Sequence, residues 1–94
     1  MYFVYIMTNY KKTVLYVGIT NNLIGRVAEH KLEQTEGFTK RYHLTNLVFY
    51  EMFNTPEEAI TAEKKIKGWK RIKKNTLISS FNPTWDDLYE KILH

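Results

Sequence analysis

The feature that most constrains the fold is a pair of short apolar runs at the start of the chain. Residues 2–8 and 13–19 are rich in β-branched and aromatic side chains, and they flank the polar sequence Asn-Tyr-Lys-Lys. Runs of this length and composition are typical of strands, and a four-residue polar loop is a length found in β-hairpins. We therefore predict an N-terminal β-hairpin, and a third strand of the same character over residues 47–53.

The register of this hairpin decides how two tyrosines lie. If the loop is residues 9–12, Tyr5 lies directly opposite Tyr16 on one face of the sheet. A one-residue change in the loop would send the two side chains to opposite faces. Aromatic pairs across a hairpin are most often a packing device. Gly18, inside the second strand, is a signal of a bulge or of a close approach to the backbone, so a site at this strand end is the alternative to simple core packing.

The first predicted helix begins after Asn21 or Asn22 and extends to about Gln34. An asparagine side chain is a good helix cap because its oxygen accepts a bond from a free backbone N–H of the first turn. The apolar residues that begin at Leu23 and end at Leu32 are spaced to form one stripe along this helix.

A second helix-start signal lies after the third strand. Thr55 is a suitable N-cap, Pro56 fits the first helical position, and Glu58 completes a capping box. Apolar side chains then recur at helical spacing from Ala59 to Trp69. Two further helices are predicted over residues 70–80 and after a cap at Thr84.

The element order is therefore β-β-α-β-α-α-α, and the fold class is α/β in the broad sense (α+β). We expect a small, three-stranded, mostly antiparallel sheet flanked by helices. The chain has 94 residues, so residues 1–94 are expected to form a single domain. A doubly wound sheet is excluded because there are too few βα units.

Composition excludes several classes of site. The chain has no cysteine, which excludes a disulfide framework, cysteine–zinc sites and a thiol nucleophile. We recognise no signal peptide, and no apolar stretch approaches the roughly 20 residues that a membrane span needs. The expectation is a soluble cytoplasmic protein without a membrane partner.

The net charge of +4 is concentrated in one segment. Half of the 14 lysines and arginines lie between residues 64 and 74, with no acidic residue among them. Such a segment attracts polyanions, although a solvated face that keeps a small protein soluble is an equal alternative. The basic residues of this segment are Lys64, Lys65, Lys67, Lys70, Arg71, Lys73 and Lys74.

Three further polar residues occupy notable positions on the predicted helices. Arg26 and His30 are four residues apart and share a helix face, where they suit phosphate binding and proton transfer. The alternative is an exposed arginine and a surface histidine that pair with neighbouring glutamates. Glu63 lies at the edge of an apolar stripe, where it is either an ion-pair partner of Lys67 or a ligand of a hard cation such as Mg²⁺.

Together these segments resemble the GIY-YIG nuclease superfamily over nearly the whole chain. The two motifs that name the family are similar to Phe-Val-Tyr at residues 3–5 and Tyr-Val-Gly at 16–18. Residues 23–31 and 57–69 resemble the family's first helix and its glutamate-bearing helix. The stretches at 37–42 and 66–69 are similar to small stand-alone members related to the N-terminal nuclease module of the excinuclease C protein. Phe3 departs from the family's glycine, and Val17 from its isoleucine.

The resemblance implies a role for each of five residues. Tyr5 and Tyr16 would activate and position the attacking water, and which of them handles the proton stays open. Arg26 would stabilise charge on the phosphate, and His30 would assist proton transfer or phosphate binding. Glu63 would be the sole protein carboxylate on a single Mg²⁺ or Mn²⁺ ion.

Asn82 is a candidate match to a later asparagine of the family, or else a turn residue before Pro83. The expected function is a metal-dependent endonuclease that hydrolyses phosphodiester bonds in DNA, including branched or damaged DNA, in DNA repair or processing. In it, Lys64, Lys67, Lys70, Arg71, Lys73 and Lys74 would bind the nucleic acid. The alternatives are a nucleic-acid-binding module that does not cleave without a partner and, last, a protein-interaction domain that uses Trp69 or Trp85.

Overall fold

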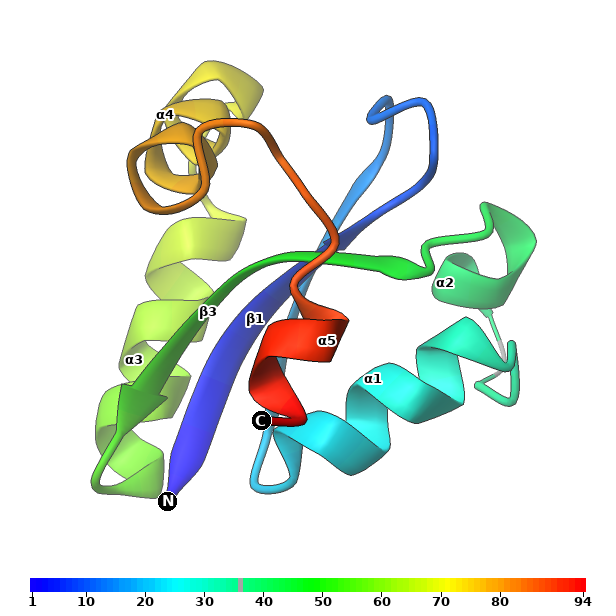
Figure 1. Ribbon diagram of the computed structural model, residues 1–94. Coiled ribbons are helices and arrows are strands. Elements are labelled where there is room, and N and C mark those ends of the chain that lie inside the picture. The colour runs from blue at the N-terminus through cyan, green and yellow to red at the C-terminus, as the bar shows by residue number, and fades with distance from the viewer. Residues whose placement is uncertain (36) are drawn as a thin grey trace.

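The computed structural model describes residues 1–35 and 37–94, which form three strands and five helices (Figure 1). The sheet has the order β2-β1-β3, and both neighbouring pairs are antiparallel, as predicted. The elements along the chain are β1 (Tyr2–Thr8), β2 (Leu15–Thr20), α1 (Leu23–Lys31), α2 (Phe38–Arg41), β3 (Asn46–Phe53), α3 (Pro56–Lys67), α4 (Arg71–Phe81) and α5 (Tyr89–Ile92).

Helices cover both faces of this sheet (Figure 1). On one face, Val4 and Ile6 of β1 and Val17 of β2 pack with residues of α3 and α4. On the other face, Tyr5 and Met7 pack with residues of α1 and the C-terminal segment. The alternation of side chains along β1 thus divides the core into two layers, and it assigns Tyr5 to the layer of α1.

The predicted pairing of the hairpin is wrong by two residues. Tyr5 lies opposite Gly18, and Met7 lies opposite Tyr16. The loop is longer than predicted because the Asn9 side chain accepts hydrogen bonds from the backbone of Thr13 (2.9 Å) and Val14 (3.2 Å), which removes both residues from the ladder. A slip of two residues preserves the side-chain alternation, so Tyr5 and Tyr16 still share a face, as diagonal neighbours.

The capping residues predicted the starts of α1 and α3 well, whereas the apolar periodicity predicted the end of α1 less well. Asn22 caps α1 through Gly25 N, and Thr55 caps α3 by accepting from Glu58 N (3.3 Å). Helix α1 ends at Lys31, earlier than predicted, and Leu32 is 67% exposed instead of belonging to the buried stripe.

The C-terminal helix also differs from prediction. Thr84 does not cap a helix, because its hydroxyl donates to the carboxylate of Asp86 (2.7 Å), and α5 begins only at Tyr89. Asp87 ties this segment to the sheet by accepting from the backbone N–H groups of Leu47 (3.1 Å) and Tyr89 (3.2 Å). The short helix α2 was not predicted. No helix within the described part of the chain is long and apolar enough to cross a membrane.

Candidate active site

Three aromatic rings from three elements meet on the α1 side of the sheet. Tyr5 comes from β1, Tyr16 from β2 and His30 from the last turn of α1. The ring centroids lie 6.2 Å apart for Tyr5 and Tyr16, 5.7 Å for Tyr5 and His30, and 5.8 Å for Tyr16 and His30. Sequence reasoning selected all three residues, and the structure brings them together. We call Tyr5, Tyr16 and His30 the aromatic cluster.

Gly18 makes this arrangement possible. A Cβ atom at this position would lie 2.6 Å from Cζ of Tyr5, 2.7 Å from its hydroxyl and 2.8 Å from Cε2 of Tyr16. Contacts this short are well inside van der Waals distance, so both tyrosine rings lie directly against the strand backbone at Gly18. The signal found in the sequence, a glycine that permits close approach, corresponds to this contact.

The cluster contains a buried hydrogen bond between Tyr5 and His30. The hydroxyl of Tyr5 lies 2.9 Å from Nε2 of His30, and the two residues are 2% and 4% exposed. Burial, and next the neighbouring Tyr16, raise the pKa of Tyr5 well above the usual range of a tyrosine. Tyr5 therefore stays protonated at neutral pH, and we assign its O–H as the donor to Nε2 of His30.

His30 is also held from its other ring nitrogen. Nδ1 of His30 lies 3.4 Å from the hydroxyl of Thr35, which lies 2.8 Å from the hydroxyl of Thr39 on α2. With Nε2 accepting from Tyr5, Nδ1 carries the proton and donates to Thr35. Burial, and next the positive charge of Arg26, lower the pKa of His30. A neutral histidine thus sits between the tyrosine of β1 and the threonines before and within α2.

The lowered pKa of His30 predicts a stability that depends on pH. The unfolded chain takes up a proton near pH 6.5 more readily than the folded protein does, so stability is complete above that pH and is lost as the pH falls through and below it. Melting temperatures at pH 7.5, 6.5 and 5.5 should fall more steeply for the wild type than for His30→Gln. The other titratable groups around His30 are present in both proteins, so their contributions to the pH dependence cancel in this comparison. These groups are Tyr5, Tyr16, Arg26 and Glu29. Parallel curves would contradict a buried neutral His30.

The two tyrosines differ in accessibility. Tyr5 is enclosed, whereas Tyr16 is half-buried on the edge strand β2. Their settings looked equivalent in the sequence because the hairpin alone does not show which ring the following helices cover. Of the two tyrosines in the cluster, Tyr16 is therefore the one that is more accessible to solvent.

Arg26 borders the cluster on α1. Its side chain is 44% exposed, and its Nη1 atom lies 3.5 Å from Oε1 of Glu29. Its charge opposes the rise in the pKa of Tyr5 and contributes to the lowered pKa of His30. The alternative of an exposed arginine beside Glu29 describes Arg26 well, but the alternative of a surface histidine is wrong for His30.

Glu63 occupies a different part of the fold. It lies on α3, whose neighbouring residues Ala59 and Ile66 pack with Val17 on the sheet face opposite the aromatic cluster. Its side chain is 15% exposed, and its Oε2 atom lies 3.1 Å from Nζ of Lys67. Helix α3 contacts the edge strand β2, which carries Tyr16 on its other face. The helix that carries Glu63 and the strand that carries Tyr16 are therefore in contact.

A divalent metal fits Glu63 only as a minimal site. No group of three or more histidine, cysteine, aspartate or glutamate side chains that could hold a metal ion occurs among the residues that the structure describes. Mg²⁺ is commonly held by one or two carboxylates, with water and substrate phosphate completing its ligands. The donor set is compatible with that mode of binding, in which Glu63 supplies one ligand.

Asn82 has its side chain engaged in the interior. Its amide nitrogen donates to the carbonyls of Val48 (3.2 Å) and Asp86 (2.8 Å), and its oxygen accepts from the Asp86 N–H (3.2 Å). Asn82 is 5% exposed and follows α4 as its C-cap. These contacts fit the turn residue that was the alternative interpretation, and they do not bring Asn82 to the aromatic cluster.

Part of the predicted basic segment is also engaged within the protein. The guanidinium of Arg71 donates to the carbonyls of Lys12 and Thr13, both at 2.9 Å, and so fastens α4 to the hairpin loop. Lys73 lies over the ring of Trp69, with Nζ 4.5 Å from the centroid. Lys67 pairs with Glu63. The remaining residues of the segment are exposed Lys64, Lys65 and Lys70 and half-buried Lys74.

Comparison with known proteins identifies the family of this chain. A family model described as the GIY-YIG catalytic domain matches residues 1–76. The chain belongs to the GIY-YIG family. The matched region includes Tyr5, Tyr16, Arg26, His30 and Glu63. The region beyond it contains Asn82.

Relatives of this GIY-YIG protein are named UPF0213 proteins, a name that states no activity. A UPF0213 protein of Staphylococcus haemolyticus is 35% identical over 77 residues, which span 82% of this chain and 93% of the relative. A UPF0213 protein of Staphylococcus saprophyticus is 38% identical over 65 residues, spanning 69% and 79% of the two chains. The solution NMR structure of a UPF0213 protein from Bacillus halodurans matches with a TM-score of 0.54 and 29% identity, over 84% of each chain. Nuclease chemistry is the class of activity that the family indicates.

Proposed function

We propose that this GIY-YIG protein is a divalent-metal-dependent endonuclease that hydrolyses phosphodiester bonds in DNA and serves DNA repair or processing. The observation that carries the proposal is the aromatic cluster, in which a buried Tyr5–His30 hydrogen bond supports the accessible Tyr16 beside Arg26. Phosphodiester hydrolysis needs a positioned water and positive charge for the phosphate in the transition state. This side of β2 offers groups of both kinds.

The accessible tyrosine has the leading role in this proposal. The hydroxyl of Tyr16 binds and orients the attacking water, because Tyr16 is half-buried on the edge strand whereas Tyr5 is enclosed. Tyr5 is enclosed and keeps its proton, so it acts as a positioning residue that fixes His30 and the ring of Tyr16. The proposal thus gives different roles to two tyrosines that the sequence left equivalent.

In this proposal, Arg26 and a metal ion held by Glu63 would balance the negative charge of the phosphate. The guanidinium of Arg26 offers a planar pair of donors to two phosphate oxygens, for which its partial exposure leaves it available. Glu63, on the other side of β2, would hold a Mg²⁺ or Mn²⁺ ion. When bound, such an ion supplies Lewis acidity and stabilises the leaving oxygen.

Cleavage of supercoiled plasmid and of branched DNA in Mg²⁺ or Mn²⁺ tests the proposal. The wild type should nick at least one of these substrates. Tyr16→Phe should slow nicking by about 10²-fold with its melting temperature unchanged, because the hydroxyl that orients the attacking water is lost. Tyr5→Phe should also lower the melting temperature, since it leaves Nε2 of buried His30 without its partner, at a cost of about 1–3 kcal/mol.

Two results would contradict the proposal. The first is an absence of cleavage on every DNA structure tried, with binding retained, which would favour a non-cleaving nucleic-acid-binding module. The second is nicking that persists unchanged in Tyr16→Phe, which would place the activity at another site or in a contaminant.

A further inference from the structure

Helix α2 presents two aromatic rings to solvent. Phe38 and Tyr42 are 48% and 40% exposed, and their ring centroids lie 4.8 Å apart with the planes inclined by 49°. Single exposed apolar side chains are ordinary on protein surfaces, but two rings in contact form a small aromatic surface. Their spacing of four residues places them on one side of the helix.

A cation lies beside these rings. Arg41 is exposed and directly precedes Tyr42 in the chain. The guanidinium carbon of Arg41 lies 5.6 Å from the centroid of the Tyr42 ring. Aromatic faces with a neighbouring cation match a nucleic-acid strand, since bases stack on the rings and a phosphate pairs with the cation. We call Phe38, Arg41 and Tyr42 the α2 platform.

The buried side of α2 fixes the platform next to the aromatic cluster. Thr39 is 6% exposed, and its hydroxyl lies 2.8 Å from that of Thr35, which in turn lies 3.4 Å from Nδ1 of His30. Two hydrogen bonds thus connect the helix of the platform with the histidine that contacts Tyr5. In Figure 1, α2 follows the end of α1 and adjoins the start of β3, clear of α3 and α4.

We propose that the α2 platform binds unpaired bases of the nucleic-acid strand that enters the candidate active site. The inference rests on the proposed function, and it specifies the substrate as one with single-stranded character. Bases within a duplex have both faces covered by their neighbours, whereas unpaired bases offer a free face for stacking. Arg71 and Lys67 of the basic segment already have polar partners within the protein, which favours α2 as the surface that holds the strand.

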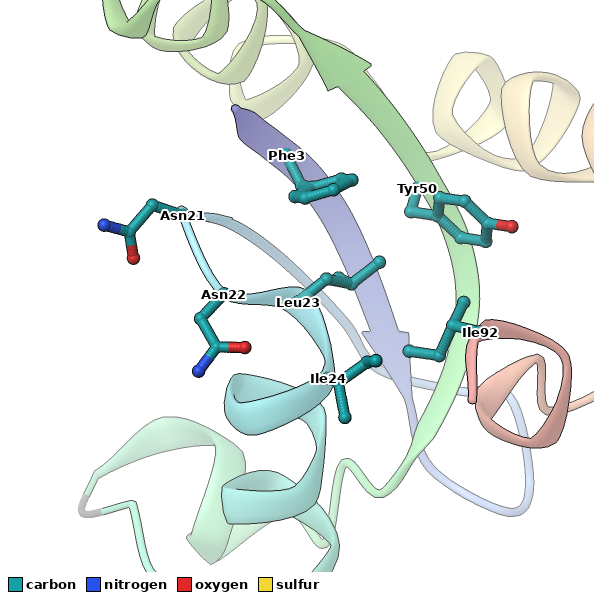
Figure 2. A pocket seen from close by; sticks show the side chains of 7 residues that line it. All are labelled: Phe3, Asn21, Asn22, Leu23, Ile24, Tyr50 and Ile92. Atoms are coloured by element: carbon teal, nitrogen blue, oxygen red, sulfur yellow. The ribbon is translucent and has the colours of Figure 1, made fainter. Parts of the chain in front are cut away.

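The pocket in Figure 2 is less suited to this task. It has a volume of about 360 Å³, and Phe3, Leu23, Tyr50 and Ile92 supply most of its apolar wall. The lysines and arginines of the chain are absent from its lining, and Ile24 lies on the flank of α1 away from Arg26. The pocket offers no charge for phosphate, so the cationic α2 platform is the better partner for a strand.

Equilibrium binding without turnover tests the proposal. Fluorescence anisotropy in EDTA compares a labelled single-stranded oligodeoxynucleotide with one of equal length in which abasic sites replace the bases. The wild type should prefer the strand with bases by at least about fivefold, because stacking on aromatic side chains accounts for that much per base. Phe38→Leu and Tyr42→Leu should abolish most of this preference while leaving affinity for the abasic strand unchanged. Tyr42→Phe, which keeps the ring, should retain the preference.

Two further variants complete the experiment. Tyr10→Leu removes an 87% exposed aromatic ring from the hairpin loop and should bind both strands as the wild type does. Arg41→Gln should weaken binding to both strands alike and reduce the salt dependence by about one phosphate contact.

The inference is overturned if both leucine variants keep the wild-type preference, or if the wild type shows no preference for bases. The first result would favour a protein partner as the ligand of the two rings. A wild type that binds through the platform and cleaves no DNA would contradict the nuclease proposal alone. A wild type that cleaves, with both leucine variants binding normally, would contradict the platform alone.

Discussion

Replacing Glu63 with glutamine should reduce metal-dependent cleavage at least a hundredfold while leaving the protein folded. Glutamine preserves the shape of the side chain and removes the negative charge. In the proposed site Glu63 is the protein's carboxylate ligand, so the variant loses the charge that attracts the divalent ion. A bound metal contributes several kcal/mol of charge stabilisation to such reactions, and about 1.4 kcal/mol corresponds to a tenfold change in rate.

The same substitution should have little effect on stability. Glu63 and Lys67 form an i,i+4 pair in which the lysine side chain is 50% exposed. Pairs of this kind contribute about 0.3–0.5 kcal/mol, which corresponds to a melting temperature lowered by less than about 4 °C in a domain of this size. A large loss of cleavage together with a small change in melting temperature separates a metal ligand from an ion pair that only supports the helix.

Glu57→Gln is the matched control for this experiment. It makes the same chemical change on the same helix, at an exposed residue of the first turn. It should cleave as the wild type does. Raising the Mg²⁺ concentration should partly restore cleavage by Glu63→Gln, because the defect is in metal affinity. Cleavage by Glu63→Gln at the wild-type rate would remove Glu63 from the mechanism and would support its role as the partner of Lys67.

Much of the fold is predictable because local signals carry it. The strands follow from runs of β-branched and aromatic residues, and the caps at Asn22 and Thr55 lie where the sequence places them. The shared face of Tyr5 and Tyr16 survives a register error of two residues, because alternation along a strand has a period of two. The prediction that two side chains share a face therefore tolerates an error in the hairpin register, provided that the error is an even number of residues.

The remaining features depend on contacts between distant segments. Arg71 fits a basic patch in the sequence, but its guanidinium reaches the carbonyls of a loop nearly 60 residues earlier. Helix α2 has four residues, which is too short for a periodic pattern. The burial of Tyr5 follows from packing against α1 and from its bond with His30, neither of which the hairpin specifies. The roles of individual polar side chains are therefore the least predictable part of the molecule.

Replacing Gly18 with alanine should lower both the stability and the activity of the protein. The new methyl group would lie 2.6 Å from Cζ of Tyr5 and 2.8 Å from Cε2 of Tyr16. Tyr5 is enclosed in the core, so its ring has little room to move away. Overpacking of this kind costs about 1–3 kcal/mol. Because the displaced rings belong to the aromatic cluster, cleavage should fall by more than the loss of folded protein explains.

Gly68→Ala is the control that isolates the effect of the tyrosines. Gly68 is the C-cap of α3 with φ −77°, and a Cβ there would meet backbone oxygens of Lys65 and Lys64 at 3.5 and 3.6 Å. These are ordinary contacts, so stability should be unchanged or raised by up to about 1 kcal/mol through the reduced entropy of the unfolded chain. Melting temperatures and nicking rates of both variants check the two expectations. If Gly18→Ala matched the wild type in both measurements, the rings of Tyr5 and Tyr16 could not lie against the β2 backbone, and the division of roles between an enclosed and an accessible tyrosine would fail with that contact.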